Sequence, residues 1–434
     1  MTNLAFQRKK FPHLTDEEFR FMVQQEEGRA RLRDKLPTLV EQADWWFPPR
    51  LACEQCSSEL TATYKAALIR QHYTPSPFGE GRGGSFIDLT GGYGIDSFYL
   101  SAFATEAHYV EQDPELCRIA VHNFARTRPH LQVHNTTAEE FLRTLPDANN
   151  KDNENNENNV LIYLDPARRD THGGKVFRIE DCTPNIIDLL PLLQQKSSVL
   201  MIKLSPMLDI TAALRSLGEG WQVHVVAIRN EVKELLFVRH SQLSDSPSSP
   251  PTKEESIELL SSIRTKLSPS LCREGQGGSF FTAANYAHDH WQTLSFTLQQ
   301  EQEAQVSYWN LQHTPRYLYE PNAAILKAAA FRFVSENYRI SKLAPNTHLY
   351  AADHLLSDFP GRVWEVIAPL TSSMLKHLPE TLQEQGASIL TRNYPLSPDQ
   401  LRKKLKLRDS ATQTIIGVRV ADKPTLFWSR RIIG

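Results

Sequence analysis

Residues 86–100 constrain the fold of this chain more than any other segment. An apolar run ends at Leu89, Gly91, Gly92 and Gly94 follow, and a helical pattern then begins. Glycine adopts backbone angles that are closed to other residues, and the first turn of a helix directs unpaired N–H groups at a ligand beside it. A buried strand, a glycine turn and a helix in this order predict the first unit of a parallel α/β sheet that binds a ligand at the turn.

Strand and helix patterns continue to alternate as far as residue 240. This alternation predicts an α/β fold with a Rossmann-like sheet whose two faces are covered by helices. The last two expected strands have no helix between them, so we expect them to form an antiparallel hairpin that ends an otherwise parallel sheet. The expected strands are residues 86–90, 107–111, 131–134, 160–164, 199–204, 222–227 and 235–238.

At 434 residues the chain is too long for one compact core and should form more than one domain. Residues 1–74 are expected to be helical, with Thr15 and Glu18 forming a capping box. The α/β pattern occupies residues 75–243, and residues 244–278 are expected to be a linker or insertion that begins rich in serine and proline. Residues 279–325 and 326–434 have mixed α and β patterns and predict an accessory region.

The composition is that of a globular protein. No apolar run approaches the roughly 20 residues that cross a bilayer, and residues 1–10 lack the apolar stretch of a signal peptide. The five cysteines are scattered, and Cys53 and Cys56 have no second pair at zinc-like spacing, so we expect neither a disulfide framework nor a metal site. The net charge of −2 gives no overall attraction to nucleic acid, so RNA binding would need a local basic patch. We expect a cytoplasmic protein.

Two acidic residues follow the ends of the first two expected strands. The Asp88 carboxylate can accept hydrogen bonds from an amino group of a ligand or from the N–H groups of its own loop, and the two roles are compatible. Glu111 comes 23 residues later, where an acid can bind both hydroxyls of a ribose, as in dinucleotide-binding folds. Asp113 is expected to cap the helix that begins at Pro114.

A second polar group follows the fourth and fifth expected strands. Asp165 and Pro166 come directly after a very apolar run. Arg168 and Arg169 follow, and their guanidinium groups suit a phosphate or a carboxylate of a substrate. Alternatively, one of these arginines pairs with Asp165 and holds the loop. Lys203 ends the fifth strand at the same edge of the sheet, where it reaches a substrate or pairs with a neighbouring aspartate.

These motifs resemble those of the bacterial class I S-adenosylmethionine-dependent methyltransferases that carry a THUMP-like C-terminal domain. The resemblance covers nearly the whole chain, and Asp-Pro-Ala-Arg-Arg is its most specific element. It implies a methyltransferase domain at 75–243, a ferredoxin-like segment at 279–325 and a THUMP-like domain at 326–434. The motifs that carry it are residues 88–96, 110–111, 165–169 and 203–206, with residues 54–62 and 319–322.

The resemblance implies S-adenosylmethionine as the cofactor and assigns residues around it. Thr137 and Ala138 lie where such enzymes bind adenine, although Thr137 stands in place of the usual acid and equally fits the cap of a plain helix. We also expect Arg168 and Arg169 to face the substrate, because of the guanidinium chemistry given above. The implied catalytic residues are Asp165, Pro166, Arg168 and Lys203. The implied cofactor-binding residues are Asp88, Thr90, Gly91, Gly92, Gly94, Asp96, Glu111, Thr137, Ala138 and Asp165.

THUMP domains bind RNA, usually tRNA, so the resemblance suggests tRNA or rRNA as the substrate. Residues 401–408 form the densest basic run of the chain and are able to contact several phosphates. The same run fits an amphipathic helix with leucines turned inward and a basic face that is merely solvated. The basic residues expected to bind the substrate are Arg402, Lys403, Lys404 and Lys406.

We therefore expect an RNA methyltransferase that transfers the methyl group directly. No cysteine lies in a position suited to covalent attack on a pyrimidine, and in-line transfer mainly requires alignment of the nucleophile and acceptance of a proton. Two other interpretations stay open: a methyltransferase acting on a protein or small molecule, and an RNA-binding protein that binds the cofactor without catalysis. The last is suggested by the absence of an aromatic residue after Pro166, since methylases of base amino groups usually stack one on the base.

Overall fold

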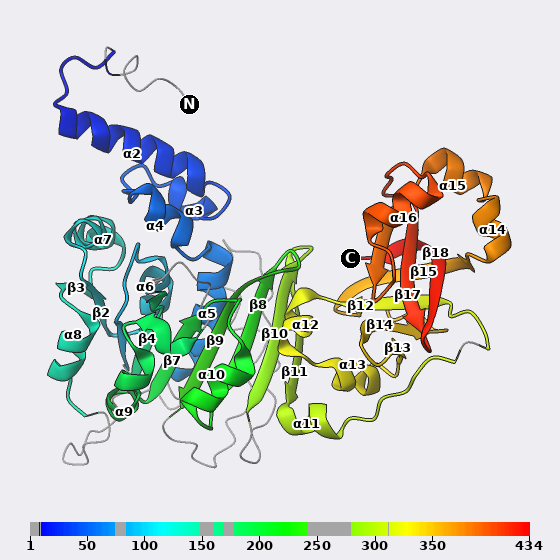
Figure 1. Cartoon of the computed structure of the whole chain (residues 1–434). Helices are drawn as coiled ribbons and strands as arrows, with labels where there is room; N and C mark the ends of the chain where they lie inside the picture. Colours follow the sequence, from blue (N-terminus) through cyan, green and yellow to red (C-terminus); the bar gives the residue numbers. More distant parts are fainter. Residues whose placement is uncertain are drawn as a thin grey trace, which may run out of the picture. The chain divides into compact units, whose positions relative to one another are not determined.

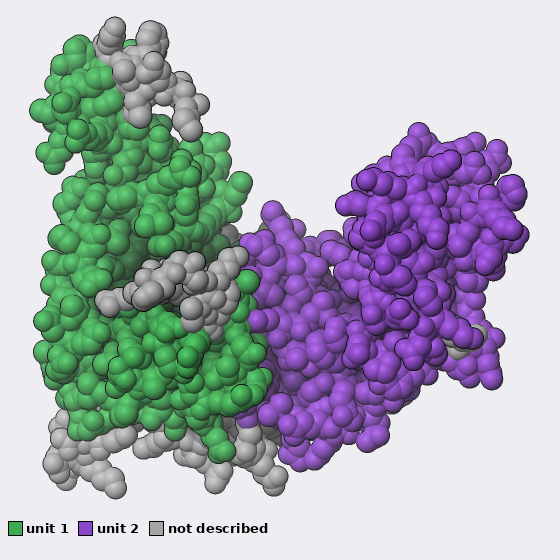
Figure 2. Space-filling model, viewed as in Figure 1, with its two compact units in different colours: residues 1–221, 236–246 green, residues 222–235, 247–434 purple. Residues whose placement is uncertain are grey.

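The computed structural model of this chain describes residues 8, 10–73, 84–147, 159–168, 178–240, 279–310 and 312–434. The expected linker or insertion at residues 244–278 and Arg169 lie outside the described residues. The chain divides into two compact units, residues 1–221 with 236–246 and residues 222–235 with 247–434 (Figure 2).

The N-terminal region of the first unit is helical (Figure 1). The Thr15 hydroxyl accepts the N–H of Glu18, and the Glu18 carboxylate accepts the N–H of Thr15, which confirms the predicted capping box. The first long helix ends at Leu32, and Pro37 begins a short separate one. The helices of this region are α2 (Asp16–Leu32), α3 (Pro37–Val40), α4 (Arg50–Gln55) and α5 (Glu59–Tyr73).

A nine-stranded sheet follows, in the order β11-β10-β8-β9-β7-β4-β1-β2-β3, and all seven expected strands are in it. The pairs from β7 across to β3 are parallel. The parallel strands are β1 (Gly84–Asp88), β2 (Glu106–Glu111), β3 (Leu131–Asn135), β4 (Asn159–Leu164) and β7 (Val199–Leu204). The intervening helices are α6 (Ile95–Leu100), η1 (Ser101–Phe103), α7 (Pro114–Thr127), α8 (Ala138–Thr144), η2 (Ile179–Asp181), α9 (Ile186–Lys196) and α10 (Ile210–Leu217). A separate two-stranded ladder consists of β5 (Ala167–Arg168) and β6 (Cys182–Thr183).

The predicted hairpin is formed by β8 (Gln222–Ile228) and β9 (Glu231–His240). Arg229 and Asn230 have positive φ, which suits the two-residue turn between them. The sheet continues beyond this hairpin, because β10 (Phe280–Ala287) pairs parallel with β8 and β11 (His290–Thr297) pairs antiparallel with β10. The boundary between the two units passes through β9.

The core of the first unit lies around β1 and β2 and includes the N-terminal region. Phe86, Tyr109 and Phe124 are buried in the same cluster as Trp45 and Phe47. The apolar composition of β4 and β7 follows from burial of both faces of a central parallel strand. The N-terminal helices therefore share one core with the sheet whose edge carries the glycine turn.

The second unit contains a seven-stranded sheet in the order β13-β14-β12-β15-β18-β17-β16, in which β16 and β17 pair parallel and the other neighbouring strands pair antiparallel. Leu318, Trp364 and Phe427 lie in one hydrophobic cluster, and Leu401 and Leu405 lie in another. The strands are β12 (Tyr317–Pro321), β13 (Ser341–Ala344), β14 (Thr347–Ala352), β15 (Gly361–Pro369), β16 (Ser388–Arg392), β17 (Thr414–Val420) and β18 (Lys423–Ile433). The helices are α11 (Leu298–Glu303), α12 (Ala323–Ala328), α13 (Phe331–Asn337), α14 (Ser372–Lys376), α15 (Glu380–Gln385) and α16 (Pro398–Leu405). Among the helices of the described residues, none has the length and apolar composition of a bilayer-crossing segment.

Candidate active site

The glycine turn between β1 and α6 is closely packed on one side and open on the other. Gly92 and Gly94 have φ of +56° and +83°, which glycine adopts without strain. A Cβ on Gly91 would overlap the Tyr109 ring, and a Cβ on Gly94 would lie 2.6 Å from Cζ of Phe124. A Cβ on Gly92 would meet nothing closer than 3.8 Å. The turn therefore packs on β2 and α7 through two of its glycines and leaves Gly92 accessible to a ligand.

Asp88 holds the turn in place. Its buried carboxylate accepts the N–H of Thr90 at 2.9 Å and the hydroxyl of Ser97 at 2.5 Å. Burial raises the pKa of Asp88 to about 7, against the lowering effect of these two hydrogen bonds. Of the two compatible roles expected from the sequence, the contact with the loop's own N–H group is present, and the contact with a cofactor amino group stays a prediction.

Glu111, at the end of β2, lies against the accessible glycine of the turn. Its carboxylate accepts the N–H of Gly92 and the N–H of Asp113, both at 2.8 Å. Asp113 in turn accepts the N–H groups of Glu115 and Leu116 and so caps α7, as predicted. The structure thus brings Glu111 to the turn, and its contact with a ribose stays a prediction.

Asp165 follows β4 and is tied to the turn and to β7. Its backbone N–H donates to the Thr90 hydroxyl at 2.6 Å, and its carboxylate forms an ion pair with Lys203 Nζ. The side chain of Asp165 is 36% exposed and that of Lys203 is 13% exposed. The carboxylate is therefore the member of the pair that solvent, and hence a substrate, reaches more easily. Of the two roles expected for Lys203, the structure shows the pairing with an aspartate.

The remaining residues of the Asp-Pro-Ala-Arg-Arg motif are described only in part. Pro166 is buried next to Asp165. Arg168 lies on β5, where its Cα pairs with that of Cys182 on β6.

Asp96 belongs to a buried polar network that no sequence pattern predicted. Its carboxylate accepts the hydroxyls of Ser57 and Tyr163 at 2.7 and 2.6 Å and lies 3.1 Å from Lys65 Nζ. Lys65 is fully buried on α5, although it is a lysine. Ala62 and Ile69 lie three and four positions from Lys65 on the same face of α5, so the sequence marks this face as one that packs inward but does not indicate the partner of its lysine.

The N-terminal region also contacts the glycine turn through Tyr93. The Trp45 indole donates to the Tyr93 hydroxyl at 2.7 Å, and this hydroxyl donates to the Trp46 carbonyl at 3.0 Å. Asn123 of α7 is hydrogen-bonded to both the N–H and the carbonyl of Trp46. The two adjacent tryptophans therefore connect the N-terminal region to the glycine turn by hydrogen bonds. The sequence alone indicated no role for them.

The expected adenine-binding residues lie at the start of α8, and the expected RNA-binding residues of the basic run lie on α16 and at its C-terminal end. Thr137 caps α8 by accepting the N–H of Glu140, and Ala138 is the first residue of that helix. On α16 the amphipathic pattern is confirmed, because Leu401 and Leu405 are buried. Arg402 is engaged with the Ala387 carbonyl and Asp409, whereas its basic neighbours Lys403, Lys404 and Lys406 are exposed.

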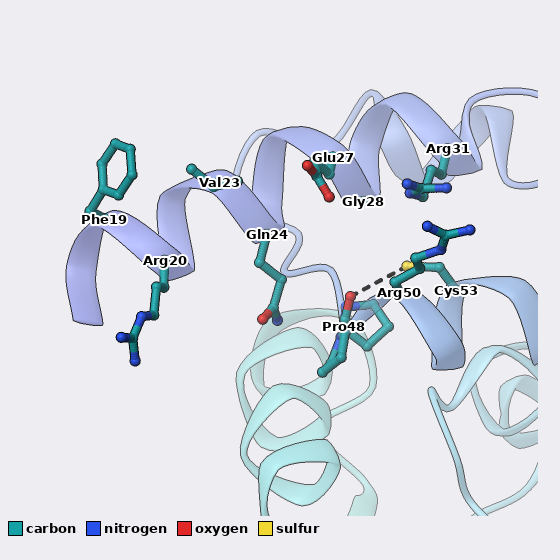
Figure 3. Close-up of a pocket in the computed structure, with 11 residues that line it drawn as sticks. Phe19, Arg20, Val23, Gln24, Glu27, Gly28, Arg31, Pro48, Arg50 and Cys53 are labelled. Atoms are coloured by element: carbon teal, nitrogen blue, oxygen red, sulfur yellow. Dashed lines mark hydrogen bonds between the residues drawn. The ribbon is translucent and has the colours of Figure 1, made fainter. Parts of the chain in front are cut away.

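A hollow of about 330 Å³ lies elsewhere in the first unit (Figure 3). It is lined by α2 residues such as Gly28 and by residues 48–50 and Cys53, whose thiol donates to the Pro48 carbonyl. None of the strand ends that carry Asp88, Glu111 and Asp165 contributes to it.

The order β3-β2-β1-β4-β7-β9-β8, with a glycine turn after β1 and acidic residues after β1, β2 and β4, defines a class I methyltransferase fold. A comparison with solved structures finds a crystal structure of a "putative methyltransferase" from Porphyromonas gingivalis W83 with 31% sequence identity and a TM-score of 0.74. The match covers 96% of this chain and 92% of that chain. This chain belongs to the family of bacterial class I S-adenosylmethionine-dependent methyltransferases with a THUMP-like C-terminal domain.

Two family models match the second unit. A ferredoxin-like domain matches residues 317–360, and a THUMP domain-like model matches residues 361–431. A search of curated proteins finds no match.

Two other solved structures are similar to part of the chain. A "putative methyltransferase" from Escherichia coli matches with 16% identity and a TM-score of 0.29, covering 43% of this chain and 90% of its own. A "putative RNA methyltransferase" from Pyrococcus horikoshii matches with 13% identity and a TM-score of 0.29, covering 44% of this chain and 89% of its own.

The residues at the glycine turn fit S-adenosylmethionine. Gly92 offers open space where the backbone must approach a ligand closely. Glu111, at the end of the neighbouring strand, contacts this same glycine, and Asp165 contacts the turn from the other side through Thr90. Carboxylates on both sides of the turn complement the positive charge of a sulfonium and of an amino group.

Proposed function

We propose that this protein is an S-adenosylmethionine-dependent methyltransferase that acts on RNA, either tRNA or rRNA. The observation that carries the proposal is the meeting of Gly92, Glu111 and Asp165 at one turn, at the carboxyl edge of a parallel sheet where such folds bind ligands. Membership of the methyltransferase family supports the reaction. The THUMP-like match at residues 361–431 supports RNA as the substrate class.

The cofactor would be held by the turn and by the residues after the first three strands. Glu111 would bind the ribose hydroxyls, Asp88 would reach the amino group directly or through water, and Thr137 with Ala138 would lie beside the adenine. When bound, S-adenosylmethionine supplies a methyl group made electrophilic by its sulfonium. The glycine turn would let the backbone approach the cofactor.

Asp165 is the residue best placed to accept a proton from a nucleophile that is an amine. Its carboxylate is partly exposed, and its backbone is fixed on the turn through the Thr90 hydroxyl. Lys203 forms an ion pair with this carboxylate and would keep it oriented. Pro166 stiffens the segment that follows, and Arg168 would contact a phosphate of the substrate. The protein's part in catalysis is then alignment and proton acceptance.

Calorimetric titration of S-adenosylmethionine tests the cofactor site. Wild-type protein is expected to bind at micromolar concentration, and Glu111→Ala is expected to weaken binding about tenfold or more, because each hydrogen bond to a charged group is worth about 1.5 to 3 kcal/mol. Glu115→Ala removes an exposed acid four residues further on and is the matched control, with unchanged affinity. Equal affinity in wild type and in folded Glu111→Ala would remove Glu111 from the site.

Transfer of the tritiated methyl group from S-adenosylmethionine tests the reaction. The acceptors, assayed separately, are total RNA and total protein from a bacterial strain that lacks this gene. We expect label in tRNA or rRNA with wild-type protein and a loss of about 100-fold or more with Asp165→Ala, the scale of a lost general base. Label in protein instead of RNA would move the substrate to another class, and cofactor binding with no label in any fraction would indicate a binding protein without catalysis.

A further inference from the structure

Lys65 lies next to the proposed active site, although it belongs to the N-terminal helix α5. Its side chain is fully buried, and its Nζ lies 3.1 Å from Asp96 Oδ1 and 3.2 Å from Ser57 Oγ. A buried ammonium is costly unless a negative charge and hydrogen bonds compensate it. This lysine is therefore held where it is by Asp96 and Ser57.

Lys203 lies between two carboxylates. It forms the ion pair with Asp165, donates to Ser57 Oγ at 3.3 Å and has Asp96 Oδ2 at 3.9 Å. Lys65 and Lys203 thus face Asp96 and Asp165, two positive groups against two negative ones. Asp96 is the more buried of the two carboxylates, 9% exposed against 36%, so an uncompensated charge on it would be the more costly.

We propose that Lys65 is a positioning residue of the active site. It neutralises Asp96, and this leaves Lys203 to hold the Asp165 carboxylate at the carboxyl edge of the sheet, where the methyl group would be transferred. Without Lys65, the cation that remains beside Asp96 within the described part of the chain is Lys203, whose Nζ lies 3.9 Å from Asp96 Oδ2, so a small movement would bring the two into direct contact. The inference rests on the proposed function for the role of Asp165 in catalysis. The arrangement of the two lysines does not depend on that function.

The surroundings of Asp96 agree with this role. Burial raises its pKa, but Lys65 and Lys203, with the hydroxyls of Tyr163 and Ser57, hold the pKa of Asp96 below its usual value. Two other titratable groups face the network. Asp88 is buried with its pKa raised to about 7, and the Cys56 thiol has a pKa raised chiefly by burial. Lys65 and Lys203 are therefore the groups that supply positive charge to Asp96.

The first test is a pair of crystal structures of the full chain. In Lys65→Met, Lys203 Nζ is expected to leave Asp165 and bind Asp96. The double variant Lys65→Met/Asp96→Asn removes both charges of the buried pair, a replacement that proteins often tolerate. In this variant Lys203 is expected to return to Asp165. Lys203 still on Asp165 in the single variant would overturn the proposal, whether or not the protein transfers methyl groups.

The second test is the pH profile of methyl transfer. Loss of Lys65 leaves an excess negative charge beside Asp165, so the acid limb of kcat is expected to move up by about one pH unit, while the Kd for S-adenosylmethionine stays unchanged. The double variant should return the acid limb to its wild-type position. A purely structural role would lower activity alike at every pH and would not be reversed by Asp96→Asn.

Two further variants keep the test decisive. Lys35→Met removes a lysine of the same region that donates to the Cys53 and Glu54 carbonyls, and it should leave the acid limb in place. If Lys65→Met does not fold, Lys65→Gln removes the charge but keeps a hydrogen-bond donor for Asp96, and the same shift is expected. If wild-type protein methylates nothing, the proposed function fails and the crystal structures alone decide the placement of Lys203.

Discussion

Residues that look alike in the sequence differ in what surrounds them. Asp88 and Glu111 both end strands at the same edge, but Asp88 is buried with its pKa raised to about 7 by that burial. An unfolded aspartate has a pKa of about 4, so between about pH 4 and about pH 7 the folded state binds more protons at Asp88 than the unfolded state does. Its contribution to stability is present at low pH and is lost as the pH rises through 7.

Asp88→Asn removes this titration while keeping the size of the side chain. The amide oxygen can still accept the N–H of Thr90, and the Ser97 hydroxyl can turn to accept from the amide. We expect the free energy of unfolding of Asp88→Asn to rise relative to wild type between about pH 5 and about pH 7, by at most about 1.4 kcal/mol for each pH unit. Urea unfolding at a series of pH values measures it. A difference that is constant over this range would contradict the raised pKa.

The role of a residue could be predicted from the sequence when its partners lie close to it along the chain or at a strand end of known position. Asp113 was predicted as a cap because its partners lie two and three residues away. The pairing of Lys203 with an aspartate was one of two roles expected for this lysine, because both strands must end at one edge of the sheet. Lys65 was missed because its partner Asp96 lies on another helix, and no local pattern encodes the packing of α5 on α6.

Strands could be predicted from the sequence where their burial produces an apolar pattern. The central strands β4 and β7 could be predicted because strands buried on both faces are apolar, and the other five expected strands are also present. The continuation of the sheet by β10 and β11 was not predicted. These strands carry polar residues such as Asn285 and Gln292 and come after more than thirty residues of linker or insertion, so nothing local indicates that they pair with β8.

Packing and ligand binding can be tested separately in the glycine turn, because Gly94 packs against the core and Gly92 faces open space. Gly92→Ala and Gly94→Ala both place a Cβ at positive φ, which costs about 1 to 2 kcal/mol. Only the second also overlaps Phe124, which is buried in the core. Gly94→Ala is therefore expected to lower the free energy of unfolding by a further 1 to 3 kcal/mol, about the cost of overpacking a core.

Gly92→Ala should instead act on the cofactor, because its Cβ would enter the open space beside the turn. We expect it to weaken S-adenosylmethionine binding in calorimetry more than it lowers stability in urea unfolding. Equal stability of the two variants, or an unchanged Kd for Gly92→Ala, would mean that the two glycines are not divided in this way.

At the scale of the whole molecule, RNA binding has to come from a local patch, because the net charge of the chain is only −2. The exposed cations of α16 and its C-terminal end are Lys403, Lys404 and Lys406, whereas Arg402 already has protein partners. Reversal of these three lysines to glutamate is expected to weaken binding of transcribed tRNA in a filter-binding assay. The slope of log affinity against log salt should fall by about 0.7 to 0.9 for each phosphate contact that is lost.

The matched control reverses Arg33, Arg143 and Arg215, which are exposed cations of the first unit, and so changes the net charge equally. If α16 is the interface, this control lowers affinity far less and leaves the salt slope almost unchanged, because these arginines would neutralise none of the phosphates that α16 contacts. An equal loss in both variants would show that the tRNA responds to overall charge alone, and no loss in either would mean that the basic face of α16 is only solvated.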